Sequence, residues 1–247
     1  MTAADQPQLS IVLPVYNEGE AVAPVIRALV DNIQTPCEIL VIYDFDADTT
    51  VPIARLLAAE LPCVRPIRND LGRGVLNAMK TGIAVARAPY ILISMADGSD
   101  EPQVVDRMVA LARGGADVVA ASRYMRGGQQ IGGPPLKRLL SRTAGLSLHW
   151  LAGIPVHDPT NNFKLYSRRF IDTVTIESTG GFELALELTV KAYLSGLTLA
   201  EIPTTWRDRT SGQSNFEIRQ WLPHYLHWYW LALAGRLNGR KTGREPR

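Results

Sequence analysis

Residues 38–48 read EILVIYDFDAD, a continuous apolar run that ends in three closely spaced aspartates. A run of this kind is typical of a strand buried on both faces of a parallel sheet, so we expect a strand over residues 38–43. Upstream, residues 9–15 form a second β-rich run, and apolar residues at helical spacing follow it. Downstream, residues 51–60 have the pattern of an amphipathic helix. Strand, loop and helix therefore repeat around the quoted stretch.

The same alternation continues along the chain. Apolar runs predict strands, and amphipathic segments predict helices, over 63–67, 75–86, 90–95, 104–112 and 118–121 in the order strand, helix, strand, helix, strand. This alternation predicts an α/β fold with a mostly parallel central sheet flanked by helices. In such sheets ligands bind at the carboxyl ends of the strands, where this sequence places its acidic loops. The Gly- and Pro-rich residues 125–135 are predicted to form a mobile loop.

The length of 247 residues and the hydrophobic share of 46% predict one sizeable core. We expect a flexible N-terminus over residues 1–8, one α/β domain over 9–215, an aromatic-rich amphipathic helix over 216–237 and a basic tail over 238–247. Three of the five tryptophans lie within residues 221–230. This helix either docks on the core or lies in a membrane interface with its rings at the headgroup level.

Charge and cysteine content exclude several classes of protein. The net charge is +2, and basic residues do not gather on one element before the tail, so nucleic-acid binding is not expected. Cys37 and Cys63 lack the spacing of a metal site or a disulfide framework. No apolar stretch reaches the roughly 18 residues of a membrane span, and the first ten residues do not resemble a signal peptide. We expect a cytoplasmic protein, peripheral on the cytoplasmic face of a membrane.

Two acidic loops are the first indication of chemistry. Asp44, Asp46 and Asp48 follow one predicted strand, and Asp97 and Asp100 follow another. Any single aspartate at such a turn could cap a helix. Two acidic clusters at the same sheet edge, however, repel each other unless a cation or ligand donors offset their charge. A nucleotide sugar fits this requirement, because its base and ribose need acceptors and its diphosphate needs a divalent cation.

The order and spacing of these motifs resemble those of the inverting glycosyltransferases of family 2. The motifs are LPVYNE at 13–18, YDFDADTT at 43–50, GRG at 72–74 and the Asp97 loop before Pro102. The later motifs make dolichyl- and polyprenyl-phosphate mannosyltransferases the most similar group; they are SRY at 122–124, DPT at 158–160, FK at 163–164, GFE at 181–183 and Arg209 with Gly212 and Ser214. The resemblance implies a GT-A type nucleotide-diphospho-sugar transferase fold, with residues 9–215 as the catalytic domain.

The resemblance also implies a donor site. Its nucleotide-sugar-binding residues would be Pro14, Tyr16, Asn17, Glu18, Asp44, Asp46, Arg73 and Asp97. A divalent cation, Mg²⁺ or Mn²⁺, would be bound by Asp97 with Asp100. Three positions depart from the family pattern: Met95 replaces the first residue of the Asp-X-Asp metal motif, Ser99 replaces the glutamine two residues after its second Asp, and Asn215 replaces a lysine. Methionine is a poor ligand for a hard cation, so the need for a metal stays open, and Arg209 would carry more of the diphosphate charge.

The implied acceptor is a lipid phosphate, and its ligands would be Arg123, Lys137, Arg138 and Ser141. Residues 137–142 alternatively form only the polar face of an amphipathic helix. A phosphate oxygen is already anionic and needs no strong base, so the catalytic residues would be those that supply electrostatic stabilisation: Asp97, Asp100, Arg123 and Arg209. A hydroxyl acceptor would need a base, for which Asp158 and Glu183 are candidates. Glu183 shares one helical face with Glu187, which suits an active-site rim or plain exposure to solvent.

The expected activity is transfer of a hexose, mannose or glucose, from a GDP- or UDP-sugar to a polyprenyl or dolichyl phosphate at a membrane surface. One alternative is a family 2 transferase that acts on a sugar hydroxyl. A second alternative is a non-catalytic nucleotide-sugar-binding subunit, which the residues at Met95 and Asn215 favour. Pairing with a second copy or with a membrane subunit is compatible with all three.

Overall fold

The computed structural model describes residues 6–208 and 218–237, with the side chains of the second segment given for 222–236. Within these residues the chain forms a seven-stranded sheet in the order β3-β2-β1-β4-β7-β5-β8. Its strands are β1 (Leu9–Pro14), β2 (Cys37–Tyr43), β3 (Val64–Arg68), β4 (Tyr90–Ile93), β5 (Val118–Ser122), β7 (Lys164–Ser167) and β8 (Leu199–Pro203). The first five of these in chain order were predicted from the sequence.

The sheet is mostly parallel, as predicted. β1 pairs with β2 and β4, β2 with β3, and β5 with β8, all in parallel. β7 is the exception, because it runs antiparallel to both of its neighbours, β4 and β5. The segment that precedes β7 therefore reaches the same edge of the sheet as the segments that follow β4 and β5. That edge collects the loops described below.

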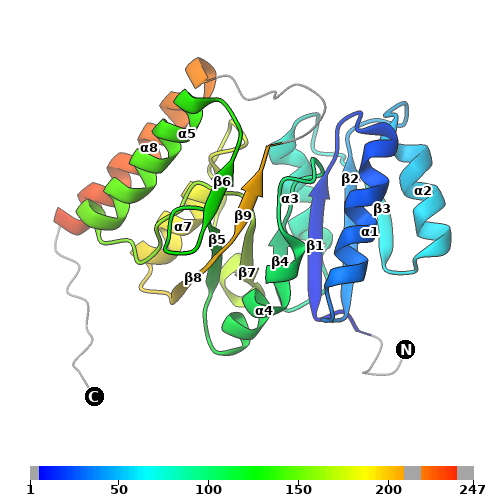
Figure 1. Ribbon diagram of the computed structural model, residues 1–247, viewed down its shortest axis with the longest axis horizontal. Helices are drawn as coiled ribbons and strands as arrows, with labels where there is room; N and C mark the ends of the chain where they lie inside the picture. Colours follow the sequence, from blue (N-terminus) through cyan, green and yellow to red (C-terminus); the bar gives the residue numbers. More distant parts are fainter. Residues whose placement is uncertain (1–5, 209–217, 238–247) are drawn as a thin grey trace.

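Helices cover both faces of the sheet (Figure 1). One face packs against α1 (Val22–Asn32), α2 (Thr50–Glu60) and α4 (Val105–Arg113), and the other against α3 (Val75–Val85), α6 (Arg168–Ile171) and α7 (Leu184–Leu194). Alternating residues of β1 point to the two faces: Ile11 packs on the face covered by α1, and Val12 packs on the face covered by α3. Gly82 lets α3 approach β1 closely, since a Cβ there would lie 2.3 Å from Val12 Cγ1. Short 3₁₀ turns, η2 (Gly19–Ala21) and η3 (Pro102–Val104), precede α1 and α4.

Two helices, α5 (Pro135–Ser147) and α8 (Ile218–Leu237), lie side by side at the end of the molecule beyond β8 (Figure 1). The Tyr229 hydroxyl donates a hydrogen bond of 2.9 Å to Ser147 Oγ and joins them. The short π-helical segment η4 (Leu148–Ala152) extends α5. Trp228 and Ala232 of α8 are buried against α7, whereas Trp230 is 64% exposed. α8 therefore docks on the core with one side and keeps apolar side chains on its outer side.

Residues 125–135, predicted to form one mobile loop, contain a short strand instead. β6 (Gln129–Ile131) pairs in parallel with β9 (Thr205–Arg207), and the backbone N–H of Gln129 donates to Thr204 O at 2.9 Å. The sequence pattern missed this strand because only three residues pair, and their partner lies about 75 positions away along the chain.

Several expectations fall on residues that the structure does not describe. They concern residues 1–5 of the N-terminus, the basic tail over 238–247, and Arg209, Gly212, Ser214 and Asn215. Gln8, at the end of the expected N-terminal segment, donates its backbone N–H to Pro36 O at 2.8 Å. Cys37 and Cys63 are free and half-buried. Among the helices described, none is both long enough and apolar enough to cross a membrane.

Candidate active site

A cavity of about 790 Å³ lies at the carboxyl edge of the sheet. It brings together most of the residues that the sequence singled out, namely Pro14, Tyr16, Glu18, Asp44, Arg73, Asp97, Asp100, Arg123, Lys137 and Ser141. The two acidic loops therefore face one cleft, opposite a basic wall. Asn17, Asp46, Arg138, Asp158 and Glu183 do not line this cavity.

Asp44, the first residue after β2, organises one end of the cavity. Its Oδ1 accepts a hydrogen bond from Asn69 Nδ2 at 2.7 Å, and its Oδ2 accepts one from the Gly74 backbone N–H at 2.8 Å. Gly74 has a φ of 127°, a conformation that a side chain would strain, at the start of α3. These contacts hold the 69–74 loop, and with it Arg73, at the cavity wall.

Aromatic and cationic side chains border Asp44. The Tyr16 ring is 54% exposed and meets the Phe45 ring edge-on, with 6.0 Å between the ring centroids. The Arg73 guanidinium lies 4.6 Å from the centroid of the Phe45 ring. An exposed aromatic face can stack with a base, and a carboxylate beside it can accept hydrogen bonds from that base. Sequence reasoning missed Phe45, which lies between two of the aspartates and contacts Tyr16 and Arg73 without itself lining the cavity.

Asn17 and Asp46 serve the loops rather than the cavity. Asn17 has a φ of 54°, donates its backbone N–H to Asp48 Oδ2 at 3.0 Å and accepts the Thr49 N–H at 3.2 Å. It thereby ties the loop after β1 to the loop after β2. Asp46 forms an exposed ion pair of 3.0 Å with Arg68.

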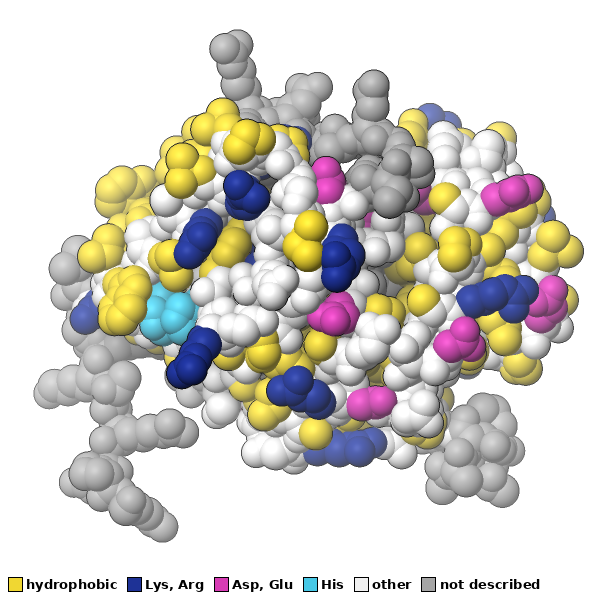
Figure 2. Space-filling view, in the orientation of Figure 1, with side chains coloured by type: hydrophobic (Ala, Val, Ile, Leu, Met, Phe, Trp, Pro, Cys, Tyr) yellow, Lys and Arg dark blue, Asp and Glu magenta, His cyan; other side chains and the backbone are white. Residues whose placement is uncertain are grey.

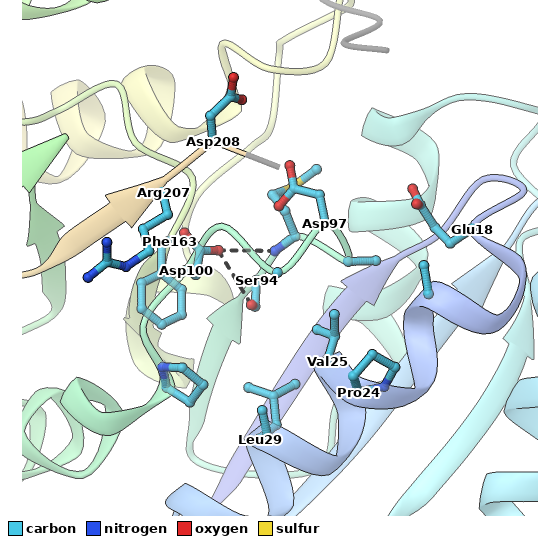
Figure 3. A pocket seen from close by; sticks show the side chains of 16 residues that line it. Glu18, Pro24, Val25, Leu29, Ser94, Asp97, Asp100, Phe163, Arg207 and Asp208 are labelled. Atoms are coloured by element: carbon cyan, nitrogen blue, oxygen red, sulfur yellow. Dashed lines mark hydrogen bonds between the residues drawn. The ribbon is translucent and has the colours of Figure 1, made fainter. Parts of the chain in front are cut away.

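The loop after β4 carries Asp97 and Asp100, which lie in different surroundings (Figure 3). Asp97 lines the cavity, and its Oδ1 accepts the Ser99 N–H at 3.1 Å. Asp100 also lines the cavity, but its Oδ2 accepts the Met95 N–H at 3.2 Å and the Ser94 hydroxyl at 3.5 Å. Burial, together with the nearby charge of Asp97, raises the pKa of Asp100 to about 7.

A second, smaller cavity of about 450 Å³ adjoins the first and shares Glu18, Met95, Asp97, Asp100 and Asp208 with it. The Asp97 carboxylate lies between those of Glu18 and Asp208 (Figure 3). Asp208 directly follows β9, which is held against the Asp97 loop because Arg207 N–H donates to Ser99 O at 3.1 Å. Sequence reasoning missed Asp208; its position beside Arg209 was the available signal.

The residues present could hold a divalent cation only together with the phosphates of a substrate. Among the residues described, no three His, Cys, Asp or Glu side chains form a group that could hold a metal. Mg²⁺ usually keeps several waters and binds one or two carboxylates together with substrate phosphates. Asp97 and Asp100, which both line the cavity, provide such a partial ligand set, whereas the Met95 side chain provides no oxygen.

The opposite wall of the cavity is built around Arg123, which follows β5. Arg123 Nε lies 2.7 Å from Asp158 Oδ2, and Nη2 lies 3.0 Å from Asp158 Oδ1. Burial alone would lower the pKa of Arg123, but the Asp158 carboxylate overrides it and raises that pKa. Burial likewise would raise the pKa of Asp158, and the guanidinium lowers it below its ordinary value. Both groups are therefore charged near neutral pH.

Lys137 and Ser141 reach the same wall from one side of α5. Ser141 Oγ is hydrogen-bonded to the hydroxyl of Tyr124, the residue after Arg123. Arg138, expected to share this role, is exposed and does not line the cavity. Arg138 follows Lys137 on α5, and consecutive residues on a helix do not face the same way, so its side chain points away from the cavity.

The two candidate bases are engaged in the fold. Asp158 is fully buried beneath Arg123. Glu183 is also fully buried, and its carboxylate accepts the backbone N–H groups of Gly180 at 2.7 Å and Gly181 at 2.6 Å. Glu187 is buried too and accepts the Ser178 N–H at 2.8 Å, so neither glutamate forms an active-site rim or an exposed face.

Residues 10–175 match the family model described as Glycosyl transferase family 2, which covers more than half of the chain. The chain belongs to glycosyl transferase family 2. This confirms the family predicted from the motifs, and it identifies the protein as a glycosyltransferase. The 790 Å³ cavity is accordingly the candidate active site of a family 2 enzyme.

Three relatives of this family 2 chain carry related names. Polyprenol monophosphomannose synthase of Mycolicibacterium smegmatis is 29% identical over 92% of the chain and 88% of the relative. Undecaprenyl-phosphate mannosyltransferase of Micrococcus luteus is 30% identical over 94% and 96%. Dolichol-phosphate mannosyltransferase of Pyrococcus furiosus is 25% identical, and the match covers 91% of the chain but 63% of that relative. Similarity to the predicted group of mannosyltransferases is thus confirmed.

Solved structures confirm the GT-A type fold. Glucosyl-3-phosphoglycerate synthase from Mycobacterium tuberculosis, in complex with Mn²⁺, UDP and glucosyl-3-phosphoglycerate, matches with a TM-score of 0.66 and 17% identity. The match covers 94% of this chain and 80% of that one. A second structure of the same synthase, with Mg²⁺ and UDP, has a TM-score of 0.65, 17% identity and the same coverage. Divalent cations therefore occur with this fold.

Proposed function

We propose that this family 2 glycosyltransferase moves a hexose from a nucleoside diphosphate sugar to a polyprenyl phosphate, with inversion at the anomeric carbon. The observation that carries the proposal is the single cavity with an acidic donor end at Asp44 and Asp97 and a basic acceptor end at Arg123 and Lys137. The names of the three relatives specify mannose, which favours mannose over glucose as the hexose.

At the donor end, the nucleoside lies against Pro14, Tyr16, Glu18 and Asp44. Carboxylate oxygens accept hydrogen bonds from the base and the ribose, and the Tyr16 ring, which packs edge-on against Phe45, offers an aromatic surface for the base. Arg73 lines the same end and brings positive charge toward the diphosphate. We assign Asn17 and Asp46 to support of these loops.

A divalent cation fits beside Asp97, with Asp100 as the second carboxylate, and would supply positive charge to the departing diphosphate. Asp97 lines the cavity from the loop after β4, while the half-buried Asp100 fixes the loop by accepting hydrogen bonds from the Met95 N–H and the Ser94 hydroxyl. Arg209 remains part of the proposal as a further positive charge at the diphosphate.

At the acceptor end, the phosphate oxygen that attacks is already anionic, so orientation replaces proton abstraction. Arg123 is held in one orientation by Asp158, and Lys137 and Ser141 add a charge and a hydroxyl on the same wall. Because Asp158 and Glu183 are engaged in the fold, the structure offers neither as a base for a hydroxyl acceptor. This favours a phosphate acceptor over a sugar hydroxyl.

The cavity opens beside a surface suited to a lipid. Leu140 of α5 and Leu222 of α8 line the cavity, and both are partly exposed. Beyond them an apolar outer surface continues over Leu136, Leu139, Trp150, Leu151, Leu226 and Trp230. Hydrophobic side chains gather over α5 and α8 with Lys and Arg side chains beside them (Figure 2). We propose that this surface, named the α5–α8 surface, rests on the membrane that holds the acceptor.

The test is incubation of the purified chain with polyprenyl phosphate, Mg²⁺ or Mn²⁺, and GDP-mannose or UDP-glucose labelled in the sugar. We expect label to enter the lipid phase from one donor and to disappear when the unphosphorylated polyprenol replaces the acceptor. In a parallel assay with a free sugar added, label that enters the sugar and not the lipid would support a hydroxyl acceptor. Donor binding without any turnover would support the non-catalytic subunit.

A further inference from the structure

Two consecutive asparagines precede β7, and only one of them is used by the fold. Asn161 is 7% exposed; its amide donates to Ala121 O at 3.0 Å, and its Oδ1 accepts the Phe163 N–H at 3.4 Å. Asn162 is half-buried, and its Oδ1 is buried without a hydrogen-bond partner among the residues described. A buried amide oxygen without a partner is unfavourable and uncommon in folded proteins.

Asn162 lines the active-site cavity, as do Thr160 and Arg123, whose side chains are already engaged in hydrogen bonds. Thr160 Oγ1 donates to Asp158 Oδ1 at 3.2 Å and accepts from Arg123 Nη2 at 3.4 Å. Asn162 is therefore the residue of this segment whose carboxamide remains to be satisfied by a ligand.

The sheet places Asn162 between the two ends of the cavity. β7 lies between β4 and β5 and runs antiparallel to both, with Lys164 opposite Ile93 and Ala120. The residues just before β7 consequently lie between the loop after β4, which carries Asp97, and the loop after β5, which carries Arg123. The Ala121 N–H, which donates to Phe163 O at 3.2 Å, continues the pairing toward Arg123.

The hexose of a donor must occupy this interval. In a single displacement the anomeric carbon lies between the leaving diphosphate and the attacking phosphate, hence between the Asp97 end and the Arg123 end. A carboxamide has both a donor and an acceptor, which matches a sugar hydroxyl. We infer that the Asn162 carboxamide binds a hydroxyl of the transferred hexose and sets which sugar the enzyme accepts. The inference rests on the donor half of the proposed function and not on the identity of the acceptor.

Binding measurements without an acceptor test this role. Calorimetry would compare GDP-mannose with GDP, and UDP-glucose with UDP, in the parent chain and in Asn162→Ala and Asn162→Asp. We expect Asn162→Ala to weaken binding of the nucleotide sugar by about tenfold, because the substitution removes a hydrogen bond at a buried polar group. Binding of the corresponding nucleoside diphosphate should not change, because the sugar is absent from it.

Donors that lack single hydroxyls identify the contact. In the parent chain, one of the 2-, 3-, 4- and 6-deoxy donors should bind about tenfold more weakly than the complete sugar nucleotide. In Asn162→Ala that difference should vanish for the same deoxy donor and persist for the others. Equal discrimination by parent and variant against every deoxy donor would overturn the inference.

Asn161→Ala is the matched control for folding. It removes two hydrogen bonds to the backbone, so it should lower the melting temperature, whereas Asn162→Ala should leave it unchanged or raise it. A melting temperature that falls as much in Asn162→Ala as in Asn161→Ala, with nucleoside diphosphate binding lost as well, would show a structural role and overturn the inference. If the parent binds the donor but labels no lipid, only the acceptor part of the proposed function fails.

Discussion

Arg123 and Asp158 form a buried, two-point ion pair, with Nε 2.7 Å from Oδ2 and Nη2 3.0 Å from Oδ1. The Arg123 backbone N–H also donates to Asp158 Oδ2 at 3.1 Å, so the carboxylate fixes both the backbone and the side chain of the arginine. The residues are 35 positions apart in the sequence, and the pair joins the end of β5 to the segment before β7. Asp158 is thus a positioning residue for Arg123 on the basic wall of the cavity.

Asp158→Asn should destabilise the protein in a pH-dependent way. Removing one charge of a buried pair costs about 3–5 kcal/mol, so the free energy of unfolding at pH 7 should fall by that order. The pKa of Asp158 in the folded protein lies below its ordinary value of 3.8, so its stabilising contribution is present above that value and is lost as the pH falls through the folded pKa. Urea unfolding at pH 7, 5 and 3 should show a gap in unfolding free energy between parent and variant that is the same at pH 7 and 5 and narrower at pH 3. A gap that is constant with pH would contradict the ion-pair assignment.

Asp44→Asn should weaken donor binding, and Asp46→Asn is its matched control. Asp44 lines the cavity and accepts the Gly74 N–H, whereas Asp46 only pairs with Arg68 at an exposed site. Hydrogen bonds to a charged group contribute about 1.5–3 kcal/mol, which predicts a loss of about 10- to 100-fold for Asp44→Asn. Calorimetry with GDP and UDP measures this. An equal effect of both substitutions would remove Asp44 from the donor site.

Lys137→Ala should raise the KM for polyprenyl phosphate by about tenfold or more while the KM for the donor stays constant. The neighbouring Arg138→Ala removes the same charge from an exposed position outside the cavity. It should change the acceptor KM little in detergent, where no membrane is present. Initial rates at varied acceptor concentration separate the two, and a larger effect of Arg138→Ala would contradict the placement of the phosphate.

Asp100→Asn should stabilise the chain above neutral pH in the absence of ligands. The pKa of Asp100 is raised to about 7 in the folded protein, from 3.8, so the folded state holds its proton more strongly. Stability from this group therefore falls as the pH rises from about 4 to about 7, at about 1.4 kcal/mol per pKa unit. Thermal unfolding in a chelator should show a higher melting temperature for Asp100→Asn at pH 8 and no gain at pH 4. A gain that is equal at both pH values would contradict the raised pKa.

Leu139→Asp should weaken binding to anionic phospholipid vesicles. Leu139 is 58% exposed on the α5–α8 surface, and burial of a leucine contributes about 1.5–3 kcal/mol, which predicts a loss of about tenfold or more. Leu56→Asp is the control, since Leu56 is 63% exposed and belongs to α2, which lies at the opposite end of the molecule from α5 and α8 (Figure 1). Vesicle sedimentation measures both variants. If both variants sediment with the vesicles to the same extent, the α5–α8 surface is not the membrane-binding surface.

The sequence by itself determined the elements whose signal is local. β1 and β2 are continuous apolar runs, and the helices that follow them have apolar residues at helical spacing, so burial of those residues requires the sheet and its two helical layers. Asp44 and Asp97 were predictable for the same reason, because Asp44 directly follows β2 and Asp97 lies in the loop after β4, both at the carboxyl edge. Their convergence follows from the parallel arrangement of β1, β2 and β4.

Only the tertiary structure decided where the polar side chains of the loops point. β7 contains the fully buried Lys164 and is four residues long, so it carries no apolar run that would predict a strand. Its antiparallel direction nevertheless brings Asp158 to Arg123 and Asn162 into the cavity. A hydrogen bond or an ion pair between residues tens of positions apart leaves no periodicity in the sequence. It depends on loop directions that the packed sheet sets, which is why Asp158 belongs to the fold and Asn162 to the cavity.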